Sequence, residues 1–104
     1  MPLHDEITEL LRLPENGAGA PSLAAIEATL TDGYAQALSL EAERTRIERQ
    51  LGEVARAAGG NGGAQEFARL SERLTSADGE LARLRSLLRT LQQRARALRG
   101  SKSL

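Results

Sequence analysis

The chain contains no cysteine and no tryptophan, and its only aromatic side chains are those of Tyr34 and Phe67. The absence of cysteine excludes disulfides and thiolate ligands for a metal. A protein that stacks nucleic-acid bases or sugars on its side chains usually needs more aromatic rings than this. These absences exclude a disulfide scaffold and disfavour a base-stacking protein.

Neither sign of charge dominates, because 14 lysine and arginine residues balance 14 aspartate and glutamate residues. The chain therefore has no overall charge that would attract nucleic acid or an anionic membrane. No apolar run approaches the ~20 residues of a membrane span. The opening residues, MPLHDEITELL, are acidic and lack the basic-then-apolar pattern of a signal peptide. We expect a cytoplasmic protein, and its many Ala, Arg, Gly and Leu residues favour a GC-rich bacterial source.

Residues suited to catalysis or metal binding are also scarce. His4 is the only histidine, and we expect it to be a solvated residue near a frayed end of the chain. A Cys–His pair is impossible, and no serine stands beside the single histidine. There is no Glu-x-x-His spacing for a metal site in a helical bundle, and the glycine-rich GGNGGA lacks the Gly-Lys-Ser/Thr ending of a phosphate-binding loop. We expect a non-enzyme with no cofactor and no metal.

What the sequence does contain is apolar residues at alternating steps of three and four, the spacing of a coiled-coil seam. This spacing predicts two long helices, over 22–58 and 64–99, each ~50 Å long at ~1.5 Å per residue. The seam positions are Leu23, Ile26, Leu30, Gly33, Ala37, Leu40, Arg44, Ile47, Leu51, Val54 and Ala58 in the first helix, and Phe67, Leu70, Leu74, Ala77, Leu81, Leu84, Leu88, Leu91, Ala95 and Leu98 in the second.

A short amphipathic helix is predicted over 3–13, where Leu3, Ile7, Leu10 and Leu11 share one face. Pro14 opens a linker over 14–21, and Ser22 is a plausible N-cap for the first long helix. Residues 100–104 are expected to be a tail. At 104 residues the chain is long enough for one small domain, and we expect residues 1–104 to form a single domain.

The two long helices are separated by a glycine-rich stretch over 59–63, which we interpret as the turn of a hairpin. Glycine and asparagine favour a helix end and a reversal, and the flanking helices are nearly equal in length. The charges agree, because folding back at Asn61 sets an acidic half against a basic half and places Arg44 near Asp78. We therefore predict an all-α fold, an antiparallel two-helix coiled-coil hairpin with a short N-terminal helix.

Two Asp-Gly pairs, at 32–33 and 78–79, lie inside the predicted helices. Asp-Gly is a turn signal, so a kink or a break is one interpretation. The seam spacing continues across both pairs, so we favour glycines that are tolerated inside unbroken helices.

The first long helix carries a second stripe of small and apolar residues away from its seam. Alanine is a good helix former, so the stripe has a purely local interpretation. Otherwise something packs on it: a second copy, giving a homodimer and a four-helix bundle, or the 3–13 helix, within one chain or across a dimer. Because a two-helix hairpin has only one seam, we expect a homodimer. The predicted interface residues are Ala24, Ala28, Thr31, Ala35, Leu38 and Ala42.

The end of the chain is basic, with Arg94, Arg96, Arg99 and Lys102 as a possible anion-binding set. Their charges suit phosphate groups of nucleic acid or lipid. The acidic residues of the 3–13 helix are tethered at the same end, so we favour pairing within the protein or between subunits, and nucleic acid is the less favoured partner.

The pattern indicates a structural or interaction protein, a self-associating hairpin that acts as an adaptor, scaffold or regulatory partner of an unidentified protein. The alternative is binding to nucleic acid or an anionic surface through the arginine-rich end. In length, helical pattern and central glycine turn the chain also resembles small secreted helical-hairpin proteins with a Trp-x-Gly turn, although it has no tryptophan and its turn reads GGNGG. That resemblance is one of gross shape, and an exported helical hairpin of a specialised secretion system is the third and least favoured function.

Overall fold

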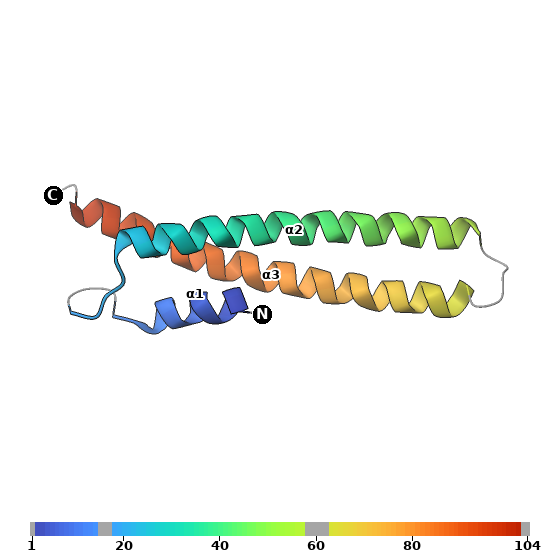
Figure 1. Cartoon of the computed structure of the whole chain (residues 1–104), viewed down its shortest axis with the longest axis horizontal. Helices are drawn as coiled ribbons and strands as arrows, with labels where there is room; N and C mark the ends of the chain where they lie inside the picture. Colours follow the sequence, from blue (N-terminus) through green and yellow to red (C-terminus); the bar gives the residue numbers. More distant parts are fainter. Residues whose placement is uncertain (1, 15–17, 58–62, 103–104) are drawn as a thin grey trace. The chain divides into compact units, whose positions relative to one another are not determined.

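The computed structural model describes residues 2–14, 18–57 and 63–102, with the side chains of residues 2, 101 and 102 excepted. This part of the chain forms three α-helices and no β-strand: α1 (Pro2–Arg12), α2 (Leu23–Arg56) and α3 (Gly63–Lys102). The long helices α2 and α3 pack against each other, so the predicted all-α hairpin is confirmed (Figure 1). Of the predicted turn, residues 59–62 lie outside the described residues, and Gly63 begins α3.

The helix boundaries lie close to the predicted ones, and local chemistry explains them. The amide of Ala25 donates to the hydroxyl oxygen of Ser22 over 3.1 Å, which makes Ser22 the N-cap of α2. Pro2 occupies the first position of α1, where a missing N–H costs no helical hydrogen bond. Helix α3 continues past residue 99, where the sequence predicts its end, to Lys102. The first three residues of the predicted tail are therefore helical.

The predicted seam forms the core of both long helices. Every buried apolar residue of α2 and α3 is a seam position, whereas the seam residue Phe67 remains 44% exposed. Arg44, the polar member of the seam, is also exposed. The buried seam residues are Ile26, Leu30, Gly33, Ala37, Leu40 and Ile47 in α2, and Leu70, Ala77, Leu81, Leu84, Leu88, Leu91 and Ala95 in α3.

The chain divides into two compact units. Unit 1 consists of residues 1–37 and 83–104, and unit 2 consists of residues 38–82. In unit 1, Arg99 of α3 binds Glu27 of α2 over 3.1 Å. In unit 2, Arg44 Nε lies 2.8 Å from Asp78 Oδ1, and this predicted pair is confirmed.

Both Asp-Gly pairs lie within unbroken helices, but the two glycines have different surroundings. Gly33 is buried against Leu88 of α3, such that an added Cβ would collide with Leu88 Cδ2 and lie 3.3 Å from its Cγ. Gly79 is exposed, and an added Cβ would meet nothing within 4 Å. Gly33 is therefore needed for the close approach of α2 and α3 in unit 1, whereas Gly79 is not needed for packing.

This contrast predicts opposite effects of the same substitution. Gly33→Ala overpacks a buried site, at a cost of about 1–3 kcal/mol, and the better helix propensity of alanine offsets about 1 kcal/mol of it. Gly79→Ala gains the propensity term alone, so it should stabilise the protein by up to about 1 kcal/mol. Urea unfolding followed by circular dichroism measures both. Equal stabilisation by the two variants would contradict the close packing at Gly33.

Candidate interaction surfaces

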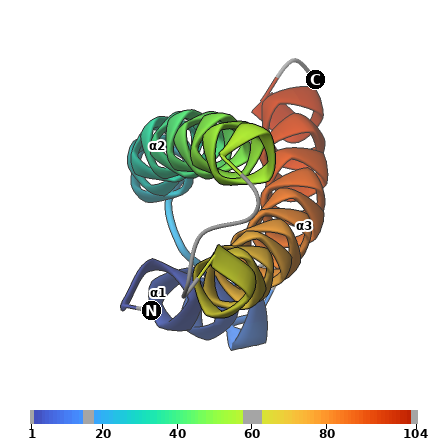
Figure 2. The ribbon, with the colours of Figure 1, turned by 90° about the vertical axis from the view of Figure 1, so that its right-hand side faces the viewer.

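Helix α1 packs in unit 1 as a third helix beside α3 (Figures 1 and 2). Its residue Ile7 is fully buried, and His4, one turn earlier, is only 9% exposed. The expectation that His4 is a solvated end residue is therefore wrong. The physical reason is the spacing of His4, Ile7 and Leu11, which places the imidazole on the packed side of the helix.

The carboxyl end of α1 is held by one side chain of α3. The guanidinium of Arg94 donates to the main-chain oxygens of Leu11 at 2.7 Å, Leu13 at 3.2 Å and Leu10 at 3.4 Å. Leu10 and Leu11 belong to the last turn of α1 and Leu13 follows it. Carbonyls at a helix end lack the amide donors of a following turn, although the Leu10 oxygen also accepts from the amide of Leu13 over 3.3 Å. A cation at this end also interacts favourably with the helix dipole. Arg94 is thus a C-terminal cap contributed by a different helix.

One signal in the sequence marks the side of α3 on which Arg94 lies. Leu87 is a large apolar residue off the seam, and it is half-buried. It precedes Arg94 by seven residues, close to two helical turns, so both lie on the same side of α3. An off-seam leucine in register with an arginine is therefore the sequence signal for this side of α3, which the seam spacing does not show.

The predicted interface stripe of α2 is open. All six residues are exposed, and Leu38 is the most exposed large apolar side chain of the described residues, at 67%. Helix α1 does not cover the stripe, because it approaches α2 at Thr29, with which its residues line a common hollow. At 100° per residue, Thr29 lies on a different side of α2 from the stripe.

The arginine-rich end does not gather into one patch. Arg94 caps α1, Arg99 pairs with Glu27, and Arg96 is exposed. The side chain of Lys102 lies outside the described part of the chain. Pairing of this end with other parts of the protein is therefore observed, although Arg94 takes main-chain carbonyls of α1 in place of its carboxylates. Anion binding by Arg94, Arg96, Arg99 and Lys102 stays a prediction.

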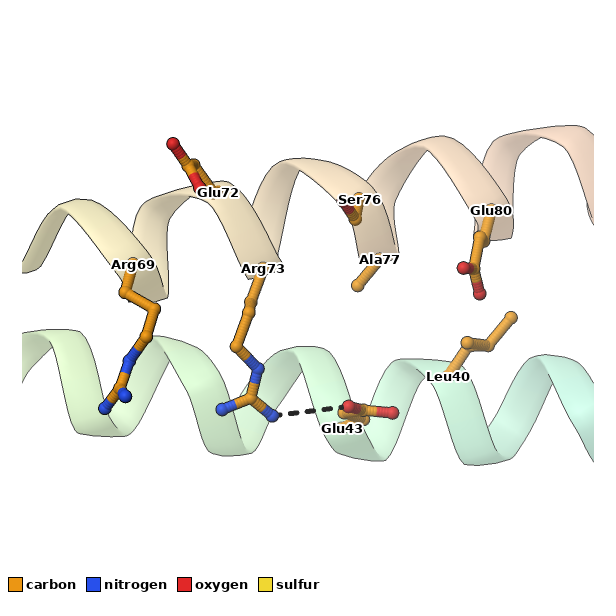
Figure 3. Close-up of a pocket in the computed structure, with 8 residues that line it drawn as sticks. All are labelled: Leu40, Glu43, Arg69, Glu72, Arg73, Ser76, Ala77 and Glu80. Atoms are coloured by element: carbon orange, nitrogen blue, oxygen red, sulfur yellow. Dashed lines mark ion pairs between the residues drawn. The ribbon is translucent and has the colours of Figure 1, made fainter. Parts of the chain in front are cut away.

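Unit 2 contains a groove of about 380 Å³ between α2 and α3 (Figure 3). Its two cations already have carboxylate partners: Arg73 lies 3.6 Å from Glu43, and Arg69 lies 2.7 Å from Glu66. The groove contains Ser76 but neither histidine nor lysine, so the serine has no such base beside it. The arrangement resembles a solvated charged surface. The lining residues are Leu40, Glu43, Arg69, Glu72, Arg73, Ser76, Ala77 and Glu80.

Over residues 2–14, 18–57 and 63–102, no three His, Asp or Glu side chains gather in a way that would hold a metal ion. Within the same ranges no helix has the length and apolar character needed to cross a bilayer. No protein-family model, curated protein or solved structure matches this chain. The exposed stripe of α2 and the contact between α1 and Arg94 are the two features of the described residues that suit interaction with another helix.

Removing the Arg94 cap should loosen α1 while leaving α2 and α3 paired. Because hydrogen bonds to charged groups contribute about 1.5–3 kcal/mol when buried and less when half-exposed, Arg94→Ala should lower the hydrogen-exchange protection of α1 amides about tenfold. The matched control is Arg96→Ala, which removes an exposed arginine of the same helix. Equal exchange of the α1 amides in both variants would show that Arg94 does not hold α1.

Proposed function

We propose that this chain is a non-enzymatic interaction protein, a helical hairpin that associates with a second copy through α2 and serves as an adaptor, scaffold or regulatory partner. The observation that carries the proposal is the exposed stripe on α2, in which Leu38 stands among small residues. A stripe at steps of three and four on the side away from the seam suits a second helical neighbour. The composition supports a bacterial source, and we propose a cytoplasmic location.

The stripe is complementary to itself in an antiparallel arrangement. When Ala35 of one α2 faces Leu38 of a second copy, Thr31 faces Ala42 and Ala28 faces Thr45 in successive layers of the same register. Leu38, the largest residue of the stripe, is then surrounded by small residues of the second copy, as a knob in a hole. Alanine and threonine around it allow two helices to approach closely.

The distribution of charge favours the same direction. Unit 1 contains eight basic and six acidic residues, and unit 2 contains six basic and eight acidic residues. Antiparallel α2 helices place the part of α2 in unit 1 beside the part in unit 2 of the second copy. Within α2, the part in unit 1 contains two acidic residues and no basic residue, and the part in unit 2 contains four of each. An antiparallel pair therefore keeps the two acidic parts away from each other, whereas a parallel pair would set them side by side. Such complementarity selects an arrangement more than it adds affinity.

The energetics of a small hairpin supply the driving force. A chain of this length buries a modest fraction of its surface and is only marginally stable by itself. Among the described residues of unit 2, the core consists of seam residues from the two helices α2 and α3 alone. Covering the stripe adds burial to α2, so association and stability are linked by mass action.

Introducing a charge into the stripe should split the dimer. We expect Ala35→Glu and Leu38→Glu to reduce the mass measured by sedimentation to that of a monomer, because a buried unpaired carboxylate is costly. The matched control, Ala82→Glu, places the same charge at an exposed position of α3 and should leave the mass unchanged. Circular dichroism checks that helicity is retained. A mass that is the same in all three variants and the parent would contradict the proposal.

Thiol cross-linking tests the register, because the chain has no cysteine of its own. In a mixture of Ala35→Cys and Leu38→Cys chains, an antiparallel pair should favour the disulfide between the two different chains. A parallel pair would instead favour disulfides between identical chains. Mass spectrometry under mild oxidation distinguishes the two results.

A further inference from the structure

The packing of α1 against the rest of unit 1 is incomplete in three respects. A hollow of about 340 Å³ lies beside α1, lined by Glu6, Glu9, Leu10 and Leu13 of the N-terminal segment and by Thr29 of α2. Leu13 remains 40% exposed. His4 is buried, yet its Nε2 atom has no hydrogen-bond partner among the described residues. A buried polar atom without a partner weakens the contact that buries it.

The length of α1 adds to this weakness. A helix of eleven residues is too short to be stable in water by itself, so it depends on its contacts with α2 and α3. Of the described side chains of α1, Ile7 is fully buried and His4 is buried to 9% exposure, whereas Leu3, Leu10 and Leu11 are only half-buried. The Arg94 cap adds to these contacts. Segments with few buried contacts open locally without unfolding the rest of the protein.

The surface of α2 and α3 that α1 covers has features that suit any short helix, not α1 alone. Arg94 binds main-chain oxygens, which every helix presents at its carboxyl end. On α3 the half-buried Leu87 lies on the same side of the helix as Arg94, and on α2 Thr29 lines the hollow beside α1. A short amphipathic helix is therefore recognised by its apolar face and by its last turn, with little demand on its other residues.

We propose that the side of α2 and α3 covered by α1 is a binding site for a short amphipathic helix of another protein. In the free protein α1 occupies this site, and the partner helix displaces it. The partner helix has an apolar residue at the position of His4 and an aliphatic residue at the position of Ile7. The main-chain oxygens of its last turn accept hydrogen bonds from Arg94. The α2 stripe lies on another side of α2, so this proposal is independent of dimerisation.

The probe is a fluorescent, C-terminally amidated peptide with the sequence of residues 2–14 and the substitution His4→Leu. It keeps the apolar face of α1 and removes the polar atom that has no partner. Its binding is measured by anisotropy against the full-length chain and against full-length Ile7→Asp, in which the resident helix is released from its seat. We expect saturable binding to both, about tenfold tighter to Ile7→Asp because the competitor is gone.

Variants in the Ile7→Asp background locate the bound peptide. Adding Arg94→Ala should weaken binding about tenfold, as expected for loss of charged hydrogen bonds to the last turn. Adding Arg96→Ala, the matched control, should leave binding unchanged. The peptide that retains His4 should bind about tenfold more weakly than the His4→Leu peptide.

Three results would overturn the proposal: no binding at millimolar peptide, equal affinity for the parent chain and Ile7→Asp, or no effect of Arg94→Ala. If Ile7→Asp loses helicity beyond α1, hydrogen exchange of the unmodified chain decides the question. Saturating peptide should then speed the exchange of the α1 amides, and an unchanged rate counts against displacement. The mass of the protein in sedimentation, which tests the α2 stripe, is a separate readout.

Discussion

The apolar side chains that hold α2 and α3 together lie in a single row on each helix, and Gly33 lets those rows meet at Leu88. A single row buries one side of each helix and leaves the others to solvent or to additional neighbours. In unit 1 part of that remaining surface is taken by α1. The stripe of α2 remains exposed, which makes α2 the helix with an unused apolar side.

The periodicity of the sequence predicts the hairpin because one pattern determines both where the helices run and which residues they bury. The buried residues of α2 and α3 are all seam positions, and Arg44 meets Asp78 as antiparallel pairing requires. The tolerated glycine at position 33 also followed from the unbroken spacing. These features are local or repeat every few residues, which is what a single sequence displays best.

The position of α1 was not predicted, for physical reasons. Its docking depends on Arg94, whose partners are main-chain carbonyls that carry no signature in the sequence. Charge pairing suggested the carboxylates of α1 as partners for the arginines, because opposite side-chain charges are visible in a sequence and helix-end carbonyls are not. The burial of His4 was not predicted for a related reason. A polar residue near the start of a chain is expected to be solvated, and only the spacing of His4 to Ile7 indicates that both lie on the packed face of α1.

The Arg94 cap has a consequence for how this protein tolerates sequence change. The guanidinium of Arg94 donates to main-chain oxygens, so it recognises the backbone of the end of α1 and not the side chains there. Substitutions there that preserve helix geometry should persist among descendants of this chain, whereas exchange of Arg94 even for lysine would lose the planar fork that reaches several oxygens at once. At the carboxyl end of α1, the evolutionary constraint therefore falls on Arg94 of α3 more than on the side chains of the last turn, while Ile7 constrains the apolar face.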